Sequence, residues 1–79
     1  MFNEWDIVVL TKDVSPAGLK RGDVGAVVHC YEGGEAFEVE FVTGRGDTIG
    51  VLTLEEADMR PIGGKDVLHA RELKQAALG

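Results

Sequence analysis

The clearest pattern in the chain is a strict alternation of apolar and acidic residues within residues 35–42. Its apolar positions are Phe37, Val39 and Phe41, and its acidic positions are Glu38 and Glu40. Because successive side chains of a strand point to opposite faces, the alternation predicts a half-buried strand with the three apolar residues in the core and both carboxylates exposed. A shift of one residue would bury the carboxylates, so the register is firmly specified.

Four further segments have the composition of short strands and are separated by turn residues. They are residues 5–11, 24–31, 48–54 and 59–62. The first is apolar on both faces, which is typical of a strand with a neighbour on each side. Pro61 places the last strand at a sheet edge, because proline has no N–H to donate.

The connections between these segments carry turn chemistry. Residues 12–22 form a long first loop with a turn at Ser15-Pro16-Ala17-Gly18, in which Gly18 can adopt a positive φ. Gly33-Gly34 predicts a two-residue hairpin turn, and Gly44-Arg45-Gly46-Asp47 predicts the turn after the alternating strand. Thr53-Leu54-Glu55-Glu56 fits a capping box, with Thr53 as N-cap and Glu56 at N3, which predicts one helical turn before the last strand.

Together these features predict an all-β fold. Five short strands, a long first loop and a helical turn before the last strand are typical of a small SH3-like barrel, here over residues 1–62. Gly63-Gly64 ends the pattern, so residues 63–79 are interpreted as a linker followed by a short amphipathic helix or a tail. Asp66 can cap a helix that runs to about Leu78, and a helix of this length is marginal in water unless it docks.

Two alternatives therefore remain open for residues 66–78. The segment is either an unstructured tail or a helix packed on its own barrel or on a neighbouring molecule. The apolar face of that helix would comprise Val67, Ala70, Leu73 and Ala77.

The charge of the chain disfavours anionic partners. The net charge is −6, and residues 1–62 carry 12 acidic and 5 basic residues, a net charge of −7. An acidic body repels nucleic acids and acidic membrane surfaces. Cys30 is the single cysteine and cannot form an intrachain disulfide. With no signal-peptide pattern and no membrane-length apolar segment, we expect a cytoplasmic protein.

Residues 6–62 resemble a family of short, uncharacterised bacterial proteins known only as domain of unknown function family 4926, which is expected to form an SH3-like barrel. The segments that carry the resemblance are Asp6-Ile7-Val8-Val9-Leu10-Thr11, Gly18-Leu19, Gly22-Asp23-Val24-Gly25, Val27-Val28-His29, Glu38-Val39-Glu40-Phe41-Val42, Thr53-Leu54-Glu55 and Arg60-Pro61. The resemblance implies no reaction, because none is assigned to the family. Gly22-Asp23-Val24-Gly25 also resembles the KOW and SH3-like modules of transcription and translation factors, which is an analogy of fold only.

Candidate chemical groups all have simpler structural interpretations. His29, Cys30 and His69 are the soft metal ligands, but adjacent strand residues point to opposite faces. We therefore expect Cys30 in the core and His29 in solvent, with neither a metal site nor a Cys-His nucleophile. The acidic cluster Glu55, Glu56 and Asp58 suits the start of a helical turn.

The remaining motifs are interpreted as turns or solvated side chains. Residues 44–50 fail the dinucleotide-binding pattern, because the third glycine comes one position late and no helix follows. Arg-Gly-Asp occurs at residues 21–23 and 45–47, where turn chemistry explains it. A local basic rim could be formed by Lys12, Lys20, Arg21 and Arg45. Stacking on bases requires exposed aromatic residues, but Trp5, Phe37 and Phe41 are expected in the core, leaving Tyr31 and Phe2.

We therefore predict no catalytic, cofactor-binding or metal-binding residues and no cofactor. The favoured function is a non-enzymatic protein–protein interaction module whose partner is another protein or a second copy, with a dimer favoured. The contact would involve a strand edge, the helix at residues 66–78, or both, because a domain of 79 residues has little stability to spare. The alternative is a KOW-like barrel that binds nucleic acid or the ribosome.

Overall fold

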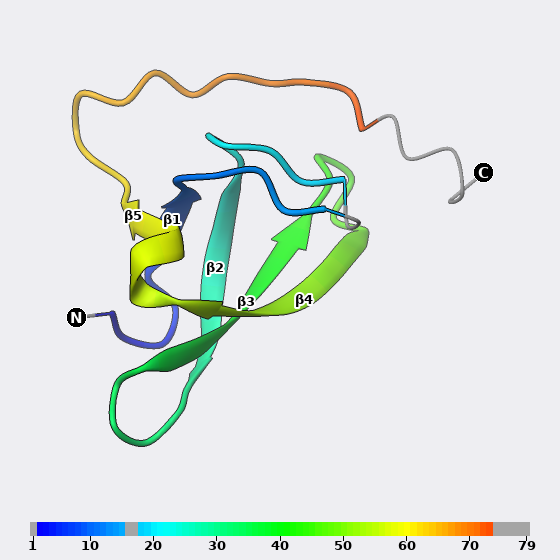
Figure 1. Cartoon of the computed structure of the whole chain (residues 1–79). Coiled ribbons are helices and arrows are strands. Elements are labelled where there is room, and N and C mark those ends of the chain that lie inside the picture. Colours follow the sequence, from blue (N-terminus) through cyan, green and yellow to red (C-terminus); the bar gives the residue numbers. More distant parts are fainter. Residues whose placement is uncertain (1, 16–17, 74–79) are drawn as a thin grey trace.

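The computed structural model describes residues 2–15 and 18–73 and contains a single five-stranded antiparallel sheet (Figure 1). The strands are β1 (Ile7–Leu10), β2 (Val24–Cys30), β3 (Ala36–Val42), β4 (Thr48–Glu55) and β5 (Met59–Pro61). A 3₁₀ turn over Glu56–Asp58 immediately precedes β5. The prediction of an all-β fold with five strands and one helical turn before the last is confirmed. The strand order β4-β3-β2-β1-β5 fits an SH3-like barrel.

The alternation in β3 places its side chains as predicted. Phe37, Val39 and Phe41 are at most 1% exposed. The buried cluster that they join contains Phe2, Val8, Leu10, Leu19, Val27, Leu54 and Met59. Glu38 and Glu40 lie on the other face, but they are half-buried rather than exposed. The cause is that hydroxyl groups of neighbouring side chains hydrogen-bond to both carboxylates.

The first strand is central, as its two apolar faces indicate. β1 pairs with β2 on one side and with β5 on the other, and β5 forms an edge that contains Pro61.

Gly25 in β2 lies so close to β3 that an added Cβ atom would be 2.8 Å from the Phe41 ring and 2.9 Å from the Glu40 carbonyl oxygen. Packing of the two strands therefore requires glycine at this position.

The connection between β2 and β3 is longer than the predicted two-residue turn. Tyr31 O accepts a hydrogen bond from Gly34 N–H at 3.2 Å, and Tyr31 N–H donates to Ala36 O at 3.1 Å. The loop therefore comprises residues 31–35. Gly33 and Gly34 do adopt positive φ angles, of 92° and 69°. The prediction is wrong in loop length because Gly34 ends the β-turn instead of occupying one of its central positions.

The predicted capping box is displaced by two residues. Glu55, rather than Thr53, is the N-cap, and the Asp58 carboxylate accepts its N–H at 2.9 Å. Thr53 remains in β4, where it pairs with Glu38 and donates its hydroxyl to that carboxylate at 2.7 Å. Pairing with β3 thus extends β4 beyond the point at which the local pattern would have ended it.

The N-terminal aromatic residues are exchanged relative to the prediction. Trp5 is 72% exposed with a φ of 73°, whereas Phe2 is 6% exposed and packs edge-on against Phe37 at a ring distance of 5.5 Å. A turn causes the exchange: Asn3 N–H donates to the Asp6 carboxylate at 2.8 Å, and Asp6 N–H donates to Asn3 O at 3.1 Å. The reversal returns Phe2 to the core and leaves Trp5 at the surface.

The first loop is attached to the core by Leu19, which is 3% exposed and bridges to Val14. Gly18 has a φ of 77°, as the predicted turn requires. The prediction at Pro16 and Ala17 falls outside the described residues.

Of the two alternatives for residues 66–78, a tail or a helix beginning at Asp66, the helix is not formed over residues 66–73. These residues run as an irregular, extended segment across the five-stranded domain of residues 2–62, which we call the barrel (Figure 1). Asp66 binds Arg60 and the N–H of Gly63 instead of capping a following turn. The rest of the predicted helix, including Ala77 and Leu78, lies outside the described residues. No helix within residues 2–15 and 18–73 is long and apolar enough to cross a membrane.

Candidate functional site

The described C-terminal segment, residues 63–73 (the tail), covers part of the outer surface of the barrel. Two cavities lie along it, one of about 260 Å³ beside residues 66–71 and one of about 470 Å³ beside residues 69–73. We call the barrel surface that lines the larger cavity the tail groove. Its main members are Leu19, Asp23, Val24, Phe41, Val42 and Ile49.

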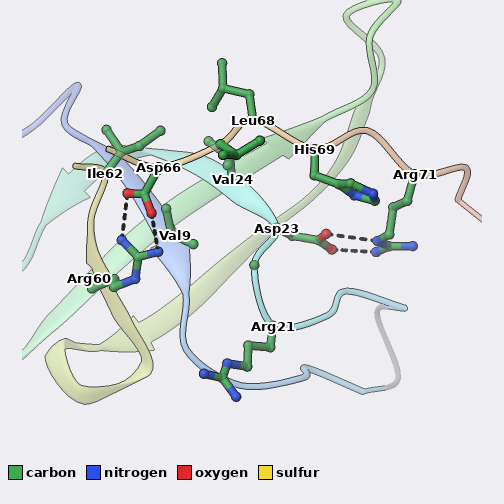
Figure 2. Close-up of a pocket in the computed structure, with 12 residues that line it drawn as sticks. Val9, Arg21, Asp23, Val24, Arg60, Ile62, Asp66, Leu68, His69 and Arg71 are labelled. Atoms are coloured by element: carbon green, nitrogen blue, oxygen red, sulfur yellow. Dashed lines mark hydrogen bonds and ion pairs between the residues drawn. The ribbon is translucent and has the colours of Figure 1, made fainter. Parts of the chain in front are cut away.

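An arginine anchors the far part of the tail to the barrel. Arg71 Nε donates to Asp23 Oδ1 at 2.9 Å, and a terminal nitrogen of Arg71 bonds to Asp23 Oδ2 (Figure 2). The same terminal nitrogen donates to Gly18 O at 3.0 Å. The Arg71 and Asp23 side chains are 27% and 18% exposed, so solvent is largely excluded from the pair. Bidentate pairs of this kind combine strength with a defined geometry.

The electrostatics of this anchor favour the ionised pair. Partial burial tends to raise the pKa of Asp23, but hydrogen bonds from Arg71 and from the Lys20 N–H outweigh it, and the pKa of Asp23 is lowered. The hydrogen bond to Asp23 raises the pKa of Arg71. Both groups are therefore charged at neutral pH.

A second pair anchors the beginning of the tail. The two terminal nitrogens of Arg60 donate to Asp66 Oδ2 at 2.9 Å and to Asp66 Oδ1 at 2.8 Å, and Gly63 N–H donates to Asp66 Oδ2 at 2.5 Å. These bonds, with that of Arg60 first, lower the pKa of Asp66 to about 2. The tail is thus attached to the barrel at two points by arginine–aspartate pairs.

The apolar residues between the anchors face solvent. Val67 and Leu68 are 88% and 76% exposed, and Figure 2 shows Leu68 directed away from the barrel. Beneath the tail, Val9 on the outer face of β1 is 5% exposed. Between its two anchors, the tail therefore covers part of the barrel without burying Val67 or Leu68.

The two edges of the sheet form a second pair of surfaces. β5 is three residues long and carries Arg60 and Pro61. β4 is eight residues long, has the sequence Thr-Ile-Gly-Val-Leu-Thr-Leu-Glu and pairs only with β3 among the described strands. Beside this edge, Val42 and Val51 are each 50% exposed.

The sequence pattern of the family described as "Domain of unknown function (DUF4926)" matches residues 4–61. The chain belongs to this family. No curated protein and no solved structure matches the chain. The family region contains all five strands and the barrel side of both anchors, Asp23 and Arg60, whereas Asp66 and Arg71 lie beyond it.

The soft ligands are not assembled into a metal site. His29 is exposed, with its ring edge-on to Tyr31 and its Nδ1 3.9 Å from a Glu4 carboxylate oxygen. Cys30 is half-buried against the core, and its thiol donates to Phe2 O at 3.5 Å. His69 lies in the tail beside both cavities. Within the described part of the chain, no three His, Cys, Asp or Glu residues form a group that could hold a metal ion.

The acidic side chains on β3 are held by hydroxyl groups. The Glu38 carboxylate accepts hydrogen bonds from the Tyr31 hydroxyl and, at 2.7 Å, from Thr53 Oγ1. The bond from Tyr31 is the main cause of the lowered pKa of Glu38, and it raises the pKa of Tyr31. Glu40 accepts a hydrogen bond from Thr48 Oγ1 at 2.8 Å.

The carboxylates at the 3₁₀ turn also have structural partners. Asp58 binds Lys12 Nζ at 2.8 Å and accepts the N–H of Glu55, and both interactions lower its pKa, with Lys12 contributing most. The predicted cluster of Glu55, Glu56 and Asp58 thus includes the cap of the turn.

Both Arg-Gly-Asp segments form turns, as predicted. Their glycines, Gly22 and Gly46, have φ angles of 93° and 94°. In the second turn Arg45 Nε lies 3.1 Å from Asp47 Oδ2, so this arginine is paired locally. In the first, the Asp23 carboxylate accepts the Lys20 N–H at 2.8 Å and binds the tail.

Sequence reasoning missed both tail anchors. Asp23 and Arg71 are 48 residues apart, and no periodicity relates them. Asp66 was interpreted as a helix cap, although Arg60 lies only six residues before it. The excess of acidic residues in residues 1–62 was the available signal, because it favours pairing with basic residues, but it does not specify which residues pair.

Proposed function

We propose that this protein is a non-enzymatic protein–protein interaction module that acts in the cytoplasm as a dimer, formed by antiparallel pairing of β4 with β4 of a second copy. The observation that carries the proposal is the open β4 edge. An edge strand presents unpaired N–H and C=O groups that another strand can bind. Eight residues provide a long backbone surface for such pairing.

A comparison of the two edges supports this choice. Natural proteins protect exposed edges with short strands, proline and charged residues. β5 has all three features, because it is three residues long and contains Arg60 and Pro61. β4 has no proline and no lysine, and its single charged residue is Glu55 at its end. β4 is therefore the edge suited to pairing.

The side chains beside β4 suit a symmetric contact. In an antiparallel pair about a two-fold axis, each copy contributes the same patch. Glu55 of one copy would lie toward the Thr48 end of the other, so the two acidic side chains do not oppose one another. Val51, which is half exposed on β4, would lose contact with water.

The carboxylates support a binding role over proton-transfer chemistry. A general acid or base works best with a pKa near the operating pH. Glu38 and Asp58 instead have lowered pKa values, caused mainly by the Tyr31 hydroxyl and by Lys12 respectively. Both are held ionised in structural hydrogen bonds.

A second candidate function is nucleic-acid or ribosome binding by a KOW-like barrel, and the exposure of Trp5 is the observation that favours it. An exposed aromatic ring can stack on a base. Trp5, however, lies between Glu4 and Asp6, and residues 1–62 carry a net charge of −7 from 12 acidic and 5 basic residues. Phosphate groups would be repelled at this surface.

The test is sedimentation velocity of the full chain over a range of concentrations. We expect a dimer at micromolar concentration, and we expect Val51→Lys to weaken dimerisation by about tenfold or more, since it places a charge beside the pairing edge. Ile7→Lys is the matched control, because Ile7 is a similarly exposed aliphatic residue on the central strand β1.

A wild-type protein that stays monomeric at every concentration would refute the dimer, as would equal effects of the two lysine variants. Fluorescence titration with a generic single-stranded oligonucleotide tests the second candidate. Sub-micromolar binding at physiological salt would favour it over the interaction module.

A further inference from the structure

The barrel presents a preformed binding position for a guanidinium group. Asp23 provides two carboxylate oxygens, and Gly18 provides a carbonyl oxygen. Barrel residues hold both acceptors in place, because the Asp23 carboxylate accepts the Lys20 N–H at 2.8 Å and Gly18 lies in the turn next to the buried Leu19. The planar fork of an arginine matches this arrangement, whereas a lysine offers only a point charge.

An apolar cavity lies beside this position. Leu73 of the tail is half-buried and lines the 470 Å³ cavity together with Leu19, Phe41 and Ile49 of the barrel. In an extended segment, residues two apart point to the same side. The groove therefore accommodates an arginine followed, two residues later, by an aliphatic side chain, and space remains around the latter.

The barrel is acidic. Residues 1–62 have 12 acidic and 5 basic residues, whereas the tail, residues 63–73, has two of each. The barrel thus attracts basic segments in general, and Asp23 fixes the position of one cation.

The tail is held in a way that permits its release. Val67 and Leu68 stay in water, so apolar burial contributes little over this stretch. The first anchor is partly exposed, with Arg60 at 48% and Asp66 at 26%, and exposed ion pairs contribute little to stability. A competing segment needs to replace only a few contacts.

We propose that the tail groove is a receptor site for an extended, basic segment of a partner protein with an arginine two residues before an aliphatic residue, and that the chain's own tail occupies this site in cis. The proposal relies on the role as a protein-interaction module but not on pairing of β4. The tail of a second copy is a poor occupant of the groove. It would have to displace an identical tail that is tethered to the same barrel and is therefore present at an effective concentration in the millimolar range. A partner segment that also fills the cavity overcomes this disadvantage.

The test measures binding of a fluorescent peptide of residues 65–73 to full-length variants by fluorescence anisotropy. Arg71→Ala releases the far part of the tail from the groove while the Arg60–Asp66 anchor remains. We therefore expect this variant to bind the peptide about tenfold more tightly than the wild type. Arg45→Ala is the matched control: it removes an arginine whose aspartate partner lies in its own turn, and we expect wild-type binding.

Two further measurements test recognition of the guanidinium. We expect binding to Arg71→Ala to be lost when alanine replaces the arginine of the peptide, and when Asp23→Asn is added to the protein. Peptide binding that is equal in the wild type and Arg71→Ala, or that survives either change, would refute the proposal. So would an Arg71→Ala protein that folds, as judged by circular dichroism, and binds no peptide.

The two proposals fail independently. Adding Val51→Lys to Arg71→Ala is expected to weaken dimerisation and to leave peptide binding unchanged. Peptide-induced amide NMR shifts should occur in residues 18–24 and at Ile49, which line the groove, rather than along residues 51–55 of β4. Shifts confined to residues 51–55 would place the peptide at the sheet edge and refute the groove as its site.

Discussion

The barrel and the tail are held by opposite kinds of interaction. In the barrel, ten mutually packed residues from Phe2 to Met59 form an apolar cluster, and no polar or charged residue is buried among the described residues. In the tail, the strongly aliphatic pair Val67-Leu68 faces water, while Asp66 and Arg71 make the contacts. The barrel is therefore stabilised by burial, and the tail is positioned by charge.

This difference separates the stability of the barrel from the attachment of the tail. Burial of apolar side chains is cooperative across the whole core, so its loss unfolds the barrel. Ion pairs at the surface can be broken and remade without disturbing the core. A chain built in this way can release its tail while the sheet and its edges remain intact.

The largest expected effect comes from breaking the core at β3. Phe41→Ala should lower the free energy of unfolding by about 3–5 kcal/mol, because it removes a fully buried ring and leaves a cavity. Chemical denaturation followed by circular dichroism measures the loss. For a domain of this size the change is enough to leave much of the protein unfolded.

The neighbouring residue provides the control for this prediction. Val42 is half exposed on the opposite face, so Val42→Ala should change the free energy of unfolding by less than about 1 kcal/mol. Similar losses for Phe41→Ala and Val42→Ala would contradict the alternation of β3 and, with it, the placement of the core.

The features that could be predicted from the sequence follow the same division between barrel and tail. The alternation around Phe37, Val39 and Phe41 could be predicted because a strand with one buried face repeats every two residues. The turn that exchanges Phe2 and Trp5 could not, because its cause is a hydrogen bond from Asn3 N–H to the Asp6 side chain. The local composition does not indicate which of the two aromatic residues is buried.

The tail shows why the candidate site was harder to predict than the fold. A helix was favoured by the spacing of apolar residues after Asp66, but the competing partner of Asp66 is Arg60 on β5. Likewise, Asp23 and Arg71 meet only once β2 and the first loop are in place. Pairings of this kind depend on tertiary geometry, and a periodic pattern does not report them.

A smaller effect is expected where β2 and β3 approach most closely. Gly25→Ala should destabilise the barrel by about 1–3 kcal/mol, because its Cβ atom would lie 2.8 Å from the Phe41 ring and 2.9 Å from the Glu40 carbonyl oxygen. The ring can shift, but the carbonyl is fixed by the sheet. Thermal unfolding measures the difference.

Gly44→Ala is the matched control for the strand contact. An added Cβ atom at Gly44 would meet no atom within 4 Å, and the backbone of Gly44 does not have a positive φ. We therefore expect Gly44→Ala to change the free energy of unfolding by less than about 0.5 kcal/mol. Equal stability of Gly25→Ala and Gly44→Ala would contradict the close approach of β2 to β3 at Gly25.

The smallest expected effect is local to the tail and depends on pH. The ordinary pKa of Asp66 is 3.8, and Arg60 together with the Gly63 N–H lowers it to about 2. A lowered pKa means that the docked state binds the proton less readily than the released state, so the anchor is fully present above pH 3.8 and is lost as the pH falls toward 2.

An amide NMR titration of Gly63, whose N–H bonds directly to Asp66, should therefore show its midpoint near pH 2. Asp66→Asn should abolish this transition without altering the amide signals of β3, because the hydrogen bonds of Asp66 are to Arg60 on β5 and to the N–H of Gly63. A midpoint near 3.8 would mean that Arg60 does not hold Asp66 in solution and that the tail has only its Arg71 anchor.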